Sequence, residues 1–241
     1  MIIYPAIDII DGNCVRLTQG KFDDVTVYEK DPVKVAKNWE AQGAEFIHVV
    51  DLDGALKGKG INRKKILEIA KNVNIPVQTG GGIREMADVD ELLTGGVKRV
   101  ILGTAALKNP DFVKDAVKKY GDKIAVGIDA KDGFVAVEGW EKVSTVRALD
   151  FAKKMSEIGV RHIIYTDIAT DGMLKGPNFS ANQNLASEVD CDIIASGGVS
   201  SNDDIYNLVP TGVGGVIIGK ALYTGKVNLA EAIKNVKNGG K

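Results

Sequence analysis

The chain has 241 residues, 44% of them hydrophobic and 26% charged, which is enough apolar material for the core of a globular domain. Lysine and arginine total 31 against 32 aspartate and glutamate residues, and no long basic run occurs, so nucleic acid is not expected as a partner. Cys14 and Cys191 are the only cysteines, and no Cys/His cluster has metal-ligand spacing, which argues against a disulfide framework and a metal site.

Membrane and export signals are not evident either. No apolar run in the sequence reaches the length of a membrane span, and the opening residues MIIYPAID lack the pattern of a signal peptide. We therefore expect a cytoplasmic protein without a membrane partner. The sequence does not report the oligomeric state, and a monomer is the default expectation.

Short apolar, β-branched runs recur along the chain and predict eight strands, at residues 2–7, 46–50, 75–78, 99–102, 124–128, 162–166, 192–195 and 215–219. Segments with helical spacing lie between most of them, as at residues 32–43, 62–73, 86–96 and 110–121. Alternating strands and helices predict an α/β fold with a parallel sheet, and eight strands close into a (β/α)8 TIM barrel. We expect residues 1–241 to form this single domain.

A strand-end pattern occurs twice, as IDIIDG at residues 7–12 and as IDAKDG at residues 128–133. Asp8 and Asp129 lie 121 residues apart, whereas a second set of pairs lies 116 apart: Asp51 and Asp167, Gly81 and Gly197, Gly82 and Gly198, Gly103 and Gly219. A single shift of five residues reconciles both intervals. Any barrel repeats its strand-helix units, but that does not explain matched chemistry, so we predict two duplicated half-barrels that meet near Gly121.

Glycine-rich turns follow the third, fourth, seventh and eighth predicted strands. In a barrel these turns open onto the active face, where backbone N–H groups can approach a phosphate. A lone Gly-Gly pair is more often only a tight turn, but here the pattern after strands 7 and 8 recurs after strands 3 and 4. We predict two phosphate sites and an elongated bisphosphate ligand, bound by Gly81, Gly82, Arg84, Gly103, Thr104, Gly197, Gly198, Gly219 and Lys220.

Acidic side chains at the strand ends are candidates for catalysis between these anchors. Asp8, Asp51, Asp129 and Thr166 end strands, and Asp171 follows in a loop. Any one of the aspartates could simply cap the next turn. The repeat favours Asp8 and Asp129 as an acid/base pair, in which burial beside a second carboxylate raises the pKa of one carboxyl.

The sequence positions of the two histidines, Arg16 and Trp140 indicate a role in the site less clearly. His48 and His162 lie inside apolar strands rather than at their ends, so we expect packing or hydrogen-bonding roles for them. Arg16 and Trp140 lie in the excursions after strands 1 and 5, where an arginine can bind phosphate and a tryptophan can stack on a planar ring. Both could equally be a surface charge or a loop anchor.

At this point the motifs resemble a known enzyme family. The segments PAIDIIDGNCVRLTQG, HVVDLDGA, GGGIR, GIDAKDGFVAVEGW, TDIATDGML and IASGGVSS, in this order, are similar to the isomerase of histidine biosynthesis that acts on a phosphoribosylformimino-aminoimidazole carboxamide ribonucleotide. The resemblance runs from Met1 to about Lys226. It implies an Amadori rearrangement of an aminoaldose to an aminoketose, catalysed without metal or organic cofactor.

The resemblance also implies roles for individual residues. Asp8 would remove the proton at ribose C2, Asp129 would protonate the ring oxygen, and Thr166 and Asp171 would orient the ribose. Trp140 would supply an aromatic contact. The cyclase subunit of imidazole glycerol phosphate synthase is similar in barrel and ligand, but its first strand typically ends in Cys-Leu-Asp, whereas this chain reads Ala6-Ile7-Asp8. A non-catalytic bisphosphate-binding barrel, and an isomerase that also accepts phosphoribosyl anthranilate, remain alternatives.

Overall fold

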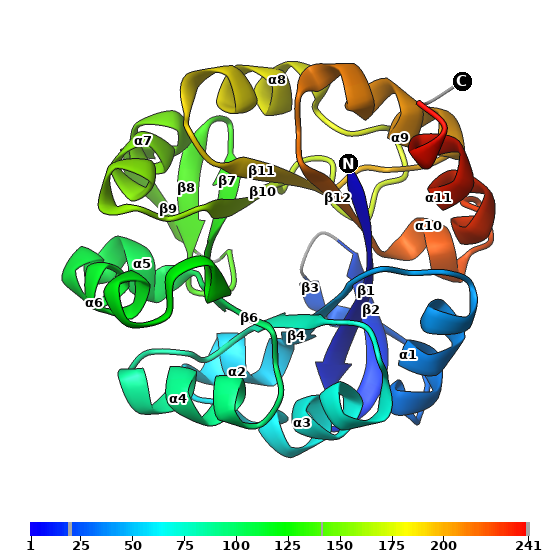
Figure 1. The fold of residues 1–241 in the computed structure, drawn as a ribbon, viewed down its shortest axis with the longest axis horizontal. Helices are drawn as coiled ribbons and strands as arrows, with labels where there is room; N and C mark the ends of the chain where they lie inside the picture. The colour runs from blue at the N-terminus through cyan, green and yellow to red at the C-terminus, as the bar shows by residue number, and fades with distance from the viewer. Residues whose placement is uncertain (19–20, 141, 240–241) are drawn as a thin grey trace.

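The fold was analysed in a computed structural model that describes residues 1–18, 21–140 and 142–239. Residues 19 and 20, which end the first motif, and residues 240 and 241, which end the expected domain, lie outside this set. Within the described ranges, eight parallel strands form a closed barrel surrounded by helices, which confirms the predicted (β/α)8 barrel (Figure 1).

The barrel strands run in chain order around the sheet. They are β1 (Ile2–Ile10), β4 (Ile47–Asp51), β5 (Val77–Gly80), β6 (Arg99–Leu102), β7 (Ile124–Lys131), β10 (His162–Asp167), β11 (Asp192–Ser196) and β12 (Gly215–Ile218). Parallel pairing of β1 with β12 and of β7 with β10 closes the ring (Figure 1). Strand β5 begins two residues later than predicted because Pro76 has no N–H for the ladder.

Helices cover the outside of the barrel. They are α1 (Pro32–Ala41), α2 (Leu52–Lys57), α3 (Arg63–Asn72), α4 (Met86–Thr94), α5 (Thr104–Lys108), α6 (Pro110–Tyr120), α7 (Ala148–Ile158), α8 (Phe179–Glu188), α9 (Asn202–Leu208), α10 (Lys220–Tyr223) and α11 (Leu229–Lys237), with 3₁₀ turns at Gly121–Lys123 and Val209–Thr211. The Asp31 side chain caps α1 by accepting from the N–H of Val33 at 3.0 Å, as its position before a proline indicates.

The interior of the barrel holds its own small cluster of buried apolar side chains. Its members are Tyr4, Ala6, Phe46, Ile101, Ala125, Ile164, Ile194 and Ile217. The larger core lies between the strands and the surrounding helices. Because the interior is packed below the strand ends, space for a ligand remains at the carboxyl ends of the strands.

Two antiparallel units of three strands each, which extend β1 and β7, were not predicted. Strand β1 turns directly into β2 (Asn13–Thr18), which pairs with β3 (Lys21–Glu29), and β7 turns into β8 (Phe134–Val137), which pairs with β9 (Lys142–Arg147). Each tight turn is an Asp-Gly pair with positive φ at both residues, 48° and 73° in the first turn and 53° and 81° in the second. This is the geometry of a type I′ hairpin turn, which Asp-Gly favours.

Candidate active site

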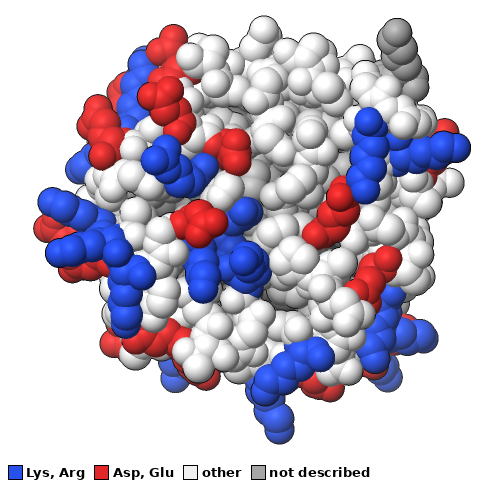
Figure 2. All heavy atoms as spheres, viewed as in Figure 1, with Lys and Arg blue, Asp and Glu red and all other residues white. Residues whose placement is uncertain are grey.

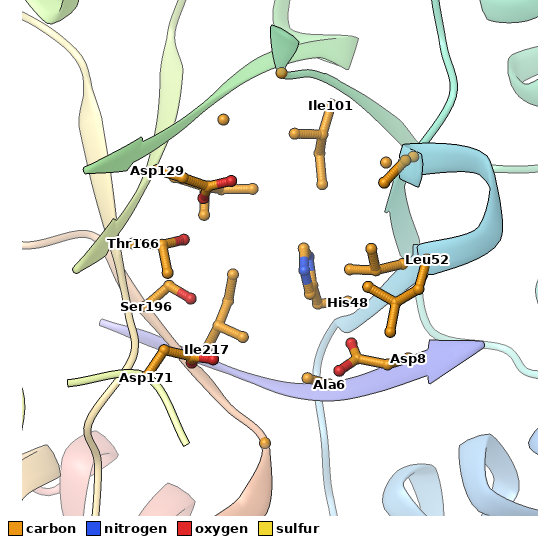
Figure 3. Close-up of a pocket in the computed structure, with 18 of the residues that line it drawn as sticks. Ala6, Asp8, His48, Leu52, Ile101, Asp129, Thr166, Asp171, Ser196 and Ile217 are labelled. Atoms are coloured by element: carbon orange, nitrogen blue, oxygen red, sulfur yellow. The ribbon is translucent and has the colours of Figure 1, made fainter. Parts of the chain in front are cut away.

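A cavity of about 270 Å³ opens at the carboxyl ends of the strands. All the predicted site residues except Asp51 line it: Asp8, Arg16, Gly81, Gly82, Arg84, Gly103, Thr104, Asp129, Trp140, Thr166, Asp171, Gly197, Gly198, Gly219 and Lys220. Figure 3 shows Asp8 on one side of this cavity and Asp129 and Thr166 on the other. The barrel thus brings together residues that are more than 100 positions apart in the sequence.

Asp8 is held by a cation. Because the Asp11-Gly12 turn folds β2 back along β1, Arg16 lies beside Asp8, and its guanidinium donates to Asp8 Oδ2 at 2.6 Å. The two side chains are 14% and 10% exposed. Burial raises the pKa of Asp8, the Arg16 charge opposes this rise, and nearby Asp171 adds to it.

Among the residues that the structure describes, Asp129 has only neutral donors. Trp140 Nε1–H donates to Asp129 Oδ2 at 2.8 Å, and the Thr166 hydroxyl donates from the neighbouring strand, where Thr166 pairs in register with Asp129. Burial raises the pKa of Asp129, these two donors oppose the rise, and the charge of Asp171 adds to it. The environments of Asp8 and Asp129 therefore differ in the charge of their partners.

Asp171 completes a group of three carboxyls in the cavity. Burial raises its pKa, while the charges of Arg16 and Lys220 lower it. Since three buried carboxyls oppose one another's ionisation, retention of a proton is easiest at the carboxyl without a cationic partner. Within this group that carboxyl is Asp129.

The glycine turns leave room where side chains would collide. A Cβ atom on Gly81 would lie 2.1 Å from the carbonyl oxygen of Asp51, and a Cβ on Gly198 would lie 2.3 Å from that of Gly176. Both glycines also have positive φ, at 107° and 92°. Only glycine fits these positions, so the turns expose backbone to the cavity.

Basic side chains stand beside both predicted anchors. The Arg84 guanidinium lies over Gly58, where an added Cβ would be 2.1 Å from its Cζ, and Lys220 begins α10 after the turn at Gly219. The guanidinium of Arg16 covers Gly219, where an added Cβ would be 2.0 Å from Nη2. Arg16, predicted to bind substrate, thus bridges Asp8 and the turn after β12.

Asp51 differs from its predicted role as a substrate-binding residue. It does not line the cavity, it is 1% exposed, and its carboxylate accepts hydrogen bonds of 2.8 Å from the backbone N–H groups of Gly54, Ile61 and Asn62 and from Asn62 Nδ2. These four bonds occupy the acceptor positions of the carboxylate. We therefore reassign Asp51 to holding the loop between β4 and α3.

His48 was not predicted to lie in the site. It lines the cavity, and Figure 3 shows it between Asp8 and Ile101. On β4 the alternate residues His48 and Val50 face the interior, as Ala6 and Asp8 do on β1, with which they pair in register. That alternation was the available signal, but both faces of a buried parallel strand are apolar, which obscures it.

The described residues contain neither a candidate metal cluster nor a candidate membrane-spanning helix. No group of three or more His, Cys, Asp or Glu side chains in these ranges is arranged to hold a metal ion. No helix in the same part of the chain is long and apolar enough to span a membrane. Basic and acidic side chains are interspersed on the face shown in Figure 2.

Comparison with known proteins identifies the relatives of this chain. It is 58% identical over 233 residues to a protein of Ruminiclostridium cellulolyticum, covering 97% of this chain and 99% of that protein. It is 56% identical over 237 residues to a protein of Acetivibrio thermocellus, covering 98% and 100%. Both are named 1-(5-phosphoribosyl)-5-((5-phosphoribosylamino)methylideneamino)imidazole-4-carboxamide isomerase.

A relative from Thermoanaerobacter pseudethanolicus has the same name and is 56% identical over 237 residues, covering 98% of this chain and 100% of its own. The family described as histidine biosynthesis protein matches residues 2–228. The match includes all eight barrel strands of the described structure and every residue of the candidate site. The chain therefore belongs to the histidine biosynthesis protein family.

Proposed function

We propose that this protein catalyses the Amadori isomerisation of the phosphoribosylformimino-aminoimidazole carboxamide ribonucleotide, an aminoaldose, to its aminoketose in histidine biosynthesis. The names of relatives that match nearly the whole chain support this function. The observation that carries the chemistry is one cavity in which Asp8 and Asp129 face each other between two glycine-lined turns (Figure 3). The substrate is a small phosphorylated molecule.

Asp129 is the proposed acid. Protonation of the furanose ring oxygen allows the C1–O bond to break, which leaves an open-chain Schiff base. A carboxyl that is buried and bonded only to neutral donors retains its proton more readily than one beside a cation. Trp140 and Thr166 hold the same carboxyl in position and accommodate its charged form after the proton has left.

Asp8 is the proposed base. It removes the proton from C2 of the opened ribose, and the resulting enolamine then becomes the aminoketose, with a carbonyl at C2 and a CH₂ group at C1. The Arg16 guanidinium at 2.6 Å stabilises the carboxylate form that this step requires. Asp171, which interacts with the positive charges of Arg16 and Lys220, is proposed to orient the ribose.

The two phosphates of the substrate are proposed to bind the two sets of turns. Gly81, Gly82, Gly103 and Thr104 with Arg84 would hold one end, and Gly197, Gly198, Gly219 and Lys220 would hold the other. Backbone N–H groups at such turns and nearby basic side chains favour an anion. A ligand tethered at both ends presents its ribose to the acid and the base in the middle.

Duplication of a half-barrel is part of the proposal. Asp51 and Asn62 are joined by a side-chain hydrogen bond of 2.8 Å, and Asp167 and Asn178, each 116 residues later, by one of 2.6 Å. These matched bonds support the repeat. We further propose that residues 1–241 form one domain, and that the protein is a cytoplasmic monomer.

The test is turnover of the purified protein. We expect it to convert the aminoaldose when that substrate is supplied alone, followed by the absorbance of the product, and we expect Asp8→Asn and Asp129→Asn to bind the aminoaldose but lose turnover. Consumption only of the aminoketose with ammonium would instead identify a cyclase. Binding without turnover by the wild type would identify a bisphosphate-binding protein, and a change in phosphoribosyl anthranilate fluorescence would reveal a second substrate.

A further inference from the structure

A chain of polar side chains crosses the interior of the barrel from the cavity to the opposite end. His48 Nδ1 lies 3.1 Å from Gln78 Nε2, and Gln78 Oε1 accepts from Arg99 Nη1 at 3.0 Å. Arg99 Nη2 lies 3.1 Å from His162 Nε2, and His162 Nδ1 lies 3.3 Å from Asp192 Oδ2. Arg99, His162 and Asp192 begin their strands, so the chain of contacts ends at the face of the barrel away from the cavity.

Arg99 determines the position of each proton in this series of hydrogen bonds, because a guanidinium has donors and no acceptor. Gln78 Oε1 accepts from Arg99, so the Gln78 amide donates its N–H to His48 Nδ1. The ring proton of His48 is then on Nε2. By the same logic His162 accepts from Arg99 at Nε2 and carries its proton on Nδ1, facing the Asp192 carboxylate.

Both rings are neutral in this arrangement. Burial lowers the pKa of His48 to about 3, with a further contribution from the Arg16 charge. Burial also lowers the pKa of His162, followed by the charge of Arg99. Neither histidine therefore takes up a proton near neutral pH, and neither suits acid/base catalysis there.

The Nε2 atom of His48 is available to bind a ligand. Within the described residues, the hydrogen bonds of the His48 ring end at Gln78, and His48 lines the same cavity as Asp8 and Asp129. It pairs in register with Ala6, one inward-facing position deeper than Asp8 on β1. Figure 3 shows the ring directed into the cavity.

We propose that Arg99, acting through Gln78, fixes the tautomer of His48 so that Nε2–H faces the cavity as a hydrogen-bond donor to an oxygen of the reacting ribose. Arg99 and Gln78 are positioning residues, since they act through His48 and do not touch the substrate. The part of the inference that concerns the ribose rests on the proposed isomerase function; the tautomer does not.

The tautomer is tested by ¹⁵N NMR of histidine-labelled protein. The chain has only two histidines, and a His162→Gln variant assigns the two rings. We expect neutral rings near neutral pH, with the proton on Nε2 in His48 and on Nδ1 in His162. A spectrum of the wild type, assigned in this way, that places the His48 proton on Nδ1 would overturn the proposal.

Gln78→Glu tests the consequence for the reaction. The new carboxylate accepts from Arg99, which balances its charge, and it also accepts from His48, so the ring proton moves from Nε2 to Nδ1. The cavity then faces a lone pair in place of a donor. We expect kcat/KM to fall about tenfold or more, mostly through KM, because the lost bond serves substrate and transition state alike.

Thr79→Val is the matched control on the same strand. Thr79 is 1% exposed, its side chain alternates to the other face of β5, and its Oγ1 has no hydrogen-bond partner among the described residues. This variant should keep the wild-type tautomers and turnover. A Gln78→Glu protein with the proton moved but kcat/KM unchanged would refute the donor role, whereas a wild type that does not convert the aminoaldose would refute the function alone.

Discussion

Replacement of Asp51 by alanine distinguishes a structural carboxylate from a substrate-binding one. The change removes four hydrogen bonds of 2.8 Å at a position that is 1% exposed. It leaves three backbone N–H groups and one N–H of the Asn62 amide without an acceptor, while the amide keeps its bond to Asp53 Oδ2 at 2.9 Å. Each orphaned donor costs about 1–3 kcal/mol, and water that enters the loop recovers part of this, so we expect a loss of about 3–5 kcal/mol in the free energy of unfolding. For a chain of this size the melting temperature falls by about 10 °C.

Urea denaturation followed by circular dichroism measures this loss, with kcat and KM determined well below the transition. Asp115→Ala, on the exposed side of α6, is the control and should change the free energy of unfolding by less than about 0.5 kcal/mol. Asp8→Asn should show the opposite pattern, with turnover lost and stability kept. An Asp51→Ala protein of unchanged stability that no longer binds the aminoaldose would refute the reassignment and restore the substrate-binding role.

Three further changes act on the proposed acid and the proposed base. Trp140→Phe removes a donor that stabilises the Asp129 carboxylate, so the pKa of the acid rises and the alkaline limb of the kcat/KM profile moves to higher pH; an unmoved limb would disconnect Trp140 from the acid. Arg16→Met removes the cation that opposes the raised pKa of Asp8, so the acidic limb moves to higher pH and kcat/KM at pH 7 falls at least about tenfold. Gly219→Ala places a Cβ 2.0 Å from Arg16 Nη2 and displaces the guanidinium, so it should shift the same limb less far; a profile identical to the wild type would show that Arg16 tolerates the intrusion.

The barrel could be predicted from the sequence because its strands are short apolar runs between helices with clear caps. The same Asp-Gly pairs that support the proposed repeat are also the strongest short-range signal for a hairpin, and the hairpins were not predicted from them. Without β2 folded back on β1, Arg16 had no predicted partner. The structure pairs it with Asp8, and this contact distinguishes the proposed base from the proposed acid.

The hydrogen-bonding role expected of His48 is confirmed by its contact with Gln78, but the positions of Asp51 and His48 relative to the cavity could not be predicted, for one physical reason. Both lie on β4, where an apolar strand is buried on both faces, so composition does not show which residues point into the barrel. The alternation that directs His48 and Val50 inward directs Asp51 outward, where the loop surrounds it. Strand-end position identified the acidic candidates, but only the direction of each side chain separates those in the cavity from those beneath a loop.

The two-residue turn at Asp11-Gly12 makes the chemistry of Asp8 sensitive to chain length. This turn fixes the register of β2 against β1, in which Val15, the neighbour of Arg16, lies opposite Asp8, so a residue inserted there would shift β2 along β1 and move Arg16 away from Asp8. Asp8 itself would be unaltered in sequence and still at the end of its strand. It would nonetheless lose its counter-charge. A change in the length of this turn therefore alters the reactivity of Asp8 without any substitution among the proposed catalytic residues.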